Sequence, residues 1–98
     1  IGIVVTDAPL SKTDLKKIAE MAHDGFARAV RPVHTQFDGD TLFAVSTSTY
    51  DENVGAISHS GASLNSIGVA AAKVVEMAII DGVTAAESLL GCVASRDW

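Results

Sequence analysis

The sequence contains little cysteine, few basic residues and few aromatic residues, and each shortage excludes a class of protein. The single cysteine, Cys92, excludes an intrachain disulfide and a cysteine-rich zinc site, and it is compatible with a reducing, cytoplasmic location. Seven Lys and Arg residues stand against twelve Asp and Glu residues, so the net charge is -5 and no positive stripe is available for nucleic-acid phosphates. No apolar run reaches the length of a membrane span. We therefore expect neither nucleic acid nor a membrane as a partner.

The apolar residues that are present are mostly small. Hydrophobic residues make up 48% of the 98 residues, but only 5% of the chain is aromatic, and alanine, valine and isoleucine dominate the rest. A core of such residues packs elements closely but offers few large anchors to a domain of this size. Length and composition therefore predict one small domain over residues 1–98 that forms a layer of a larger assembly.

Hydrophobic periodicity predicts an α/β order of elements. Short β-branched runs indicate strands, and apolar residues at helical spacing indicate helices. The predicted order is strand, helix, strand, helix, helix, over residues 1–6, 11–30, 41–47, 61–80 and 84–91. Because two strands make an incomplete sheet, we expect the missing strands from another chain or from a removed segment.

Capping residues set the expected ends of the helices. Ser11 with Asp14 three residues later resembles a capping box, and Pro32 disfavours a helix beyond about residue 30. Gly25 lowers helix propensity, and a glycine at such a position indicates a close approach by another element.

Similar signals predict the end of the second long helix. Asp81-Gly82 is expected to end the helix that starts near residue 61, with the glycine as C-cap. Thr84 and Glu87 resemble a second capping box, which would open a short helix that stops at Gly91.

Asp38 and Asp40 flank Gly39 where a polar loop leads into the strand predicted over 41–47. Asp-Gly is a common turn dipeptide, so the pair is consistent with a solvated turn. Two nearby carboxylates also oppose each other's ionisation, which suits a proton-handling site. His34 is a candidate general base, or a metal ligand together with the two aspartates, but a structural hydrogen bond is the more usual role of such a histidine. The residues alone leave these interpretations open.

The other candidates are weaker. His23 falls within the predicted helix 11–30, opposite the apolar stripe, where we expect it to be exposed. His59 lies between two serines, but a serine–histidine arrangement needs a convergence in space that sequence does not show. No glycine-rich phosphate-binding pattern is present.

Three blocks of sequence carry a family resemblance that spans the chain. They are IGIVVTDAPL from Ile1 to Leu10, AHDGFARAVRP from Ala22 to Pro32, and FDGDTLFA from Phe37 to Ala44. In this order and spacing they resemble the C-terminal portion of the P1 family of peptidases. That family contains the DmpA aminopeptidases, the β-peptidyl aminopeptidases and the 6-aminohexanoate-oligomer (nylon) hydrolases. The stretch over residues 31–40 looks closest to the nylon-hydrolase branch.

The resemblance implies a self-processed hydrolase with an N-terminal nucleophile. Members of the family are made as one precursor, which cleaves itself into a larger α chain and a smaller β chain. The threonine or serine that then begins the β chain is the nucleophile. Residues 1–98 would belong to that β chain, with the nucleophile just before Ile1. Asp38 and Asp40 match an aspartate pair that orients the nucleophile and tunes its protonation.

The resemblance also implies a fold and partners. The expected fold is a layered helix-sheet-sheet-helix sandwich (DmpA-like), completed by the α chain of the same precursor. The α/β units are expected to form a higher homo-oligomer and to act on small peptides or amide oligomers. No metal or cofactor is expected.

Two rival functions remain. Because Ile1 has no hydroxyl, the chain would alternatively be a non-catalytic scaffold or binding subunit with the same fold. The other rival is a metal-assisted hydrolase that uses His34, Asp38 and Asp40.

Overall fold

Two strands pair in parallel, with two helices between them in the chain and a long helix after the second strand. The computed structural model describes residues 1–52 and 63–98. Its elements in chain order are β1 (Gly2–Thr6), α1 (Lys12–Ala22), α2 (Asp24–Ala29), β2 (Leu42–Ser46), α3 (Leu64–Ala85) and the 3-10 helix η1 (Ser95–Asp97). The β1–β2 register places Gly2 opposite Leu42 and Thr6 opposite Ser46. Both predicted strands are confirmed.

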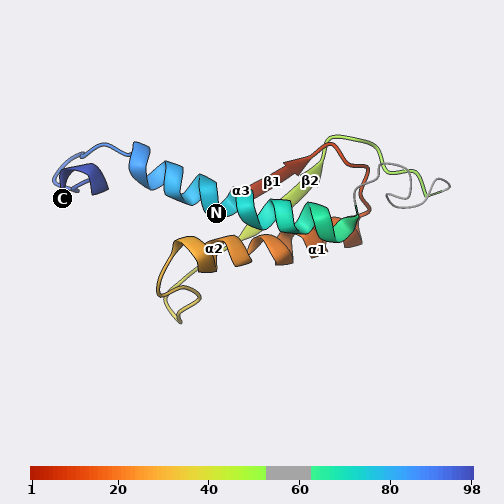
Figure 1. Ribbon diagram of the computed structural model, residues 1–98, viewed down its shortest axis with the longest axis horizontal. Helices are drawn as coiled ribbons and strands as arrows, with labels where there is room; N and C mark the ends of the chain where they lie inside the picture. The colour runs from red at the N-terminus through yellow and green to blue at the C-terminus, as the bar shows by residue number, and fades with distance from the viewer. Residues whose placement is uncertain (53–62) are drawn as a thin grey trace.

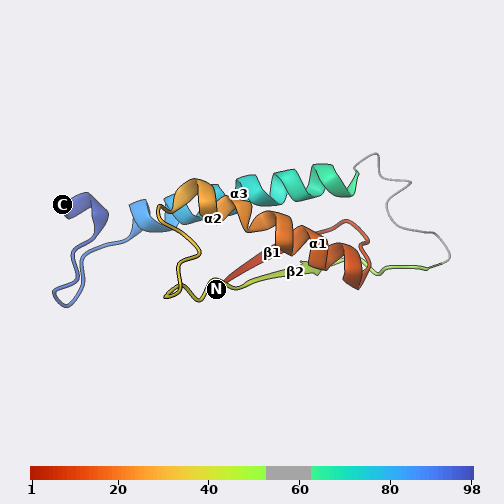
Figure 2. The same ribbon diagram turned by 90° about the horizontal axis from the view of Figure 1, so that it is seen from below.

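The helices cover one face of the two-stranded sheet (Figures 1 and 2). In Figure 2, α3 runs along the top with α2 beside it, the strands lie below, and α1 reaches from α3 down to the strands. α1 packs on β2, and α3 packs on α1 and α2 and contacts β1. The opposite sheet face carries four exposed apolar side chains, those of Ile3, Val5, Phe43 and Val45. This chain is thus a helix layer on an α/β sheet whose second face is apolar and uncovered.

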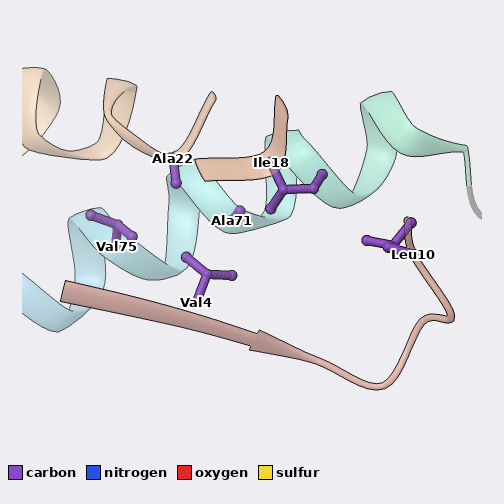
Figure 3. Packing of buried hydrophobic residues seen from close by; sticks show 6 residues of the cluster. All are labelled: Val4, Leu10, Ile18, Ala22, Ala71 and Val75. Carbon is purple, nitrogen blue, oxygen red and sulfur yellow. The ribbon is translucent and has the colours of Figure 1, made fainter. Parts of the chain in front are cut away.

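The core lies between the sheet and the helices and consists of aliphatic side chains. Figure 3 shows the six residues of its buried cluster: Val4, Leu10, Ile18, Ala22, Ala71 and Val75. Ile18 of α1 is fully buried. The core of small residues predicted from the composition is confirmed.

The capping box at the start of α1 is present. The Asp14 N–H donates to Ser11 Oγ at 3.1 Å, and the Ser11 N–H donates to Asp14 Oδ2 at 3.3 Å. The prediction of one helix over 11–30 is wrong in one respect, because His23 separates α1 from α2. This break redirects the chain so that α2 lies directly against α3.

The end of α3 differs from the prediction. The helix continues through Asp81 and Gly82 to Ala85, so Gly82 does not cap it. Thr84 does not open a new helix either, because its hydroxyl donates to the carbonyl of Ile80 at 2.9 Å within α3. Residues 89–92 instead form a turn closed by an antiparallel bridge between Leu89 and Cys92.

The last carbonyls of α3 are satisfied by side chains from the C-terminal tail. Arg96 Nη2 donates to the carbonyls of Thr84 at 3.2 Å and Ala85 at 2.6 Å, and Ser95 Oγ donates to the Val83 carbonyl at 2.9 Å. These partners provide the C-terminal cap that a helix needs.

No helix in the part of the chain that the structure describes reaches the length and hydropathy of a membrane span.

Gly25 marks the close approach that its position in the sequence indicates. A Cβ atom on Gly25 would lie 2.5 Å from the Ala72 carbonyl oxygen and 2.9 Å from the Glu76 nitrogen, both in the backbone of α3. Backbone atoms of a packed helix cannot move aside as the end of a flexible side chain can. α2 and α3 therefore touch backbone to backbone at this point.

We expect Gly25→Ala to lower the free energy of unfolding of the complete protein by roughly 1 to 3 kcal/mol, because the methyl group overpacks the contact with α3. Thermal unfolding would measure the effect. Gly82→Ala is the matched control, since Gly82 has open space around it, and it should stabilise the helix by up to about 1 kcal/mol. Equal effects of the two substitutions would contradict the close-approach interpretation.

Candidate active site

Asp38 lies in the loop between α2 and β2, and hydrogen bonds to Thr35 within the same loop hold it in place. The Thr35 N–H donates to Asp38 Oδ2 at 2.7 Å, and the Asp38 N–H donates to the Thr35 carbonyl at 3.1 Å. This reciprocal pair closes a turn over residues 35–38 and gives the Asp38 carboxylate a defined direction. Sequence reasoning missed the role of Thr35, although the spacing of three between a polar residue and an aspartate is a signal for such a local loop.

Asp40 is held by a different partner. His34 Nδ1 lies 2.9 Å from Asp40 Oδ2. Because an ionised carboxylate only accepts hydrogen bonds, the Nδ1–H of His34 is the donor. The His34 side chain is 46% exposed and that of Asp40 is 22% exposed, so the carboxylate is the more sheltered partner. The structural hydrogen bond considered for His34 is confirmed.

The parallel register brings the beginning of β1 to this loop. The Gly2 N–H donates to the Thr41 carbonyl at 2.9 Å, and Gly2 pairs with Leu42. Asp40 therefore comes one residue before the loop joins the ladder. A hollow of about 260 Å³ opens at the same strand ends, and apolar side chains of α2 and α3 line it, including Phe26 and Ile79.

His23 stands behind His34. Its ring centroid lies 5.7 Å from that of His34 and 5.7 Å from that of Phe26. The prediction that His23 is exposed is wrong, because its place at the break between α1 and α2 leaves it half-buried against these two rings. The histidines at 23 and 34, eleven positions apart in the sequence, thus lie beside each other, and His34 contacts Asp40.

The geometry does not support a metal site. Among residues 1–52 and 63–98, no group of three His, Cys, Asp or Glu side chains could hold a metal ion, and His34, Asp38 and Asp40 are all in these ranges. The metal-assisted alternative therefore gains no support. The serine–histidine idea at His59 falls outside the described residues.

Comparison with known proteins gives full-length matches to one family. The family model described as peptidase family S58 matches residues 1–96. An uncharacterized aminopeptidase of Mycobacterium bovis is 38% identical over 99% of the chain, and so is one of Mycobacterium tuberculosis. Each match covers 30% of the relative, so the chain spans about a third of the length of these curated proteins.

A second group of relatives matches a shorter stretch. A 6-aminohexanoate-oligomer endohydrolase of a Kocuria species is 41% identical over 52% of the chain, a match that covers 14% of that enzyme. No solved structure matches the chain. The resemblance read from the sequence blocks is confirmed by these matches, and the chain belongs to peptidase family S58, the DmpA family.

Proposed function

We propose that the chain is the β-chain part of a self-processed amide hydrolase whose nucleophile is a threonine or serine directly before Ile1. The enzyme would release small amino-terminal residues from peptides or cleave linear amide oligomers. These are the two activities named for the relatives, an aminopeptidase and a 6-aminohexanoate-oligomer endohydrolase. The observation that carries the proposal is the parallel register of β1 and β2.

The register predicts where the nucleophile lies. Gly2 pairs with Leu42, so continuing the same ladder by two positions sets the residue before Ile1 opposite Asp40. Neighbouring strands lie about 5 Å apart, which is within reach of two short side chains. Strand alternation puts both on the helix side of the sheet, where Val4 and Leu42 also point. The nucleophile would thus stand beside the Asp40 carboxylate.

The proposed reaction uses two groups of the N-terminal threonine or serine, its side-chain hydroxyl and its α-amino group. Its hydroxyl oxygen attacks the amide carbonyl carbon, and its own α-amino group takes the hydroxyl proton and passes it to the departing amine. The C–N bond breaks, and an ester joins the acyl group to the enzyme. Water then hydrolyses the ester and restores the hydroxyl.

The two aspartates would orient this terminus from fixed positions. Asp38 is anchored by the Thr35 N–H and Asp40 by His34, so neither carboxylate needs to be ordered when substrate binds. A carboxylate beside the terminal amine stabilises the positive charge that the amine acquires when it takes the hydroxyl proton. This is the preorganised electrostatic arrangement that a proton-transferring site requires.

The uncovered sheet face supports a partner chain. Ile3, Val5, Phe43 and Val45 form an apolar surface on the side of the sheet away from the helices. In the proposal, a sheet of the α chain covers this face and completes a helix-sheet-sheet-helix sandwich. The outer side of α3 is also apolar at Val69, Val74, Met77, Ile80 and Val83, and it supports the assembly of these α/β units into a higher homo-oligomer. A cytoplasmic location remains part of the proposal.

Intact mass spectrometry with N-terminal sequencing of the protein expressed from its complete gene tests the self-processing. We expect two chains, with the smaller one beginning with threonine or serine followed by the sequence from Ile1. Replacement of that residue by alanine should leave the precursor uncleaved. A single chain would favour the non-catalytic scaffold or binding subunit, and a small chain that begins elsewhere would contradict the proposed nucleophile.

Asp38→Asn and Asp40→Asn test the site directly. Each keeps the size of the side chain and an acceptor oxygen but removes the charge, so we expect kcat/KM to fall by about 10²- to 10⁴-fold while thermal unfolding changes little. Asp81→Asn, on the exposed end of α3, makes the same change outside the site and should have no effect. Wild-type turnover in both site variants would contradict the assignment.

Phe43→Lys tests the partner surface. Phe43 is 54% exposed on the open sheet face, and a lysine there would be buried unpaired under the α chain. We expect the two chains to fail to co-purify, or the precursor to fail to process, as seen by size-exclusion chromatography and gel analysis. Thr13→Lys on the exposed side of α1 is the control. Normal assembly of the Phe43 variant would rule out this face as the interface.

A further inference from the structure

We propose that His34 is a positioning residue for Asp40, so that the loop between α2 and β2 aims the carboxylate before any substrate arrives. The inference rests on the proposed function, because it takes Asp40 as the carboxylate beside the nucleophile. Three observations carry it: the hydrogen bond from the ring, the backbone conformation of His34, and the packing of His23 behind the ring.

The hydrogen bond determines which oxygen of Asp40 is left for the reaction. His34 Nδ1 donates to Oδ2 at 2.9 Å, and this contact restricts rotation of the carboxylate about its terminal bond. Oδ1 is then the oxygen left to accept from the amine or hydroxyl of the nucleophile. A histidine that orients a second group through one ring nitrogen is a common way of setting the geometry of a polar site.

The backbone of His34 adopts a conformation that is unusual for a residue other than glycine. Its φ is 56°, in the left-handed region that non-glycine residues occupy rarely. Such conformations persist where the surroundings hold them, and they are common at functional sites. Here the conformation coincides with the contact between the His34 ring and Asp40, six residues further along the chain.

The ring is also supported from behind. The His23 and His34 rings are 5.7 Å apart at a tilt of 53°, and His23 rests in turn on Phe26 of α2. Because His23 lies at the break between α1 and α2, the helix layer provides a side chain that packs against the His34 ring. The break that separates the predicted single helix is thus what places His23 against the loop.

The chain offers substitutions that separate the hydrogen bond from the backbone conformation. Asparagine tolerates a positive φ and carries an N–H donor close to the position of Nδ1, so His34→Asn keeps both features. Glycine accepts the positive φ without strain but has no donor. Both substitutions remove the ring contact with His23, so the difference between His34→Gly and His34→Asn isolates the hydrogen bond. Gln36→Gly places a glycine at an exposed position of the same loop and controls for added flexibility.

The test uses the complete protein with these variants, Asp40→Asn and the double variant His34→Gly/Asp40→Asn. The readouts are the rate of precursor cleavage by intact mass, and kcat and KM on an aminoacyl p-nitroanilide and on a linear 6-aminohexanoate oligomer. We expect His34→Gly to lower kcat and the cleavage rate about 10- to 100-fold with little change in KM, the usual effect of losing an orienting partner. His34→Asn and Gln36→Gly should stay near wild type. In the Asp40→Asn background, His34→Gly should have no further effect.

The outcomes distinguish this inference from the proposed function. If Asp40→Asn is impaired but His34→Gly is not, the positioning role is overturned and the proposed function stands. The same holds if His34→Gly and His34→Asn are equally impaired, or if the effects of His34→Gly and Asp40→Asn multiply in the double variant. If the wild-type protein neither processes itself nor cleaves either substrate, or if Asp40→Asn is fully active, the proposed role of Asp40 fails and the inference fails with it.

Discussion

The parallel pairing of β1 and β2 is the constraint on which the arrangement of the chain depends. Parallel strands cannot be joined by a tight turn, so α1 and α2 must carry the chain back to the end at which β1 begins. The loop that re-enters the sheet therefore lies beside the start of β1, and that loop carries Asp38 and Asp40. In an antiparallel hairpin the same loop would lie at the far end of β1. The position of the candidate site thus follows from the direction of the two strands, and the side chains of the loop then determine its chemistry.

The helix layer depends on small residues at its contacts. Gly25 of α2 touches the backbone of α3 at Ala72, and Gly68 of α3 leaves room for the Met21 side chain of α1. This close approach buries one face of α3 with few large side chains, which explains a core made mostly of alanine, valine and isoleucine. It also leaves two apolar surfaces uncovered, the second sheet face and the outer side of α3. A chain built in this way has more apolar surface than it can bury alone, as expected for one layer of a larger assembly.

Most features that sequence reasoning predicted correctly have partners a few residues apart, and the close approach at Gly25 is the one whose partner, Ala72, is distant. The two residues of the capping box, Ser11 and Asp14, are three positions apart, and a run of five residues is enough to recognise a strand such as β1. The predictions were wrong where the extent of an element depends on residues far away in the sequence. α3 continues past Gly82 because its last carbonyls bind Arg96 and Ser95, which follow 11 or 12 residues later. The exposed glycine costs the helix only about 1 kcal/mol, which is too little to end a helix that is capped elsewhere.

By itself the sequence determined the family, the two strands and the main helical segments, the small-residue core and the two aspartates as candidates. These follow from local periodicity, composition and blocks of residues, none of which needs a third dimension. Only the tertiary structure decided that His34 rather than the other aspartate is the hydrogen-bond partner of Asp40, and that His23 stands behind it. It alone decided that the start of β1 meets the same loop. The reason is physical: strand pairing and helix packing join residues distant in the sequence, and burial of apolar surface selects the pairing.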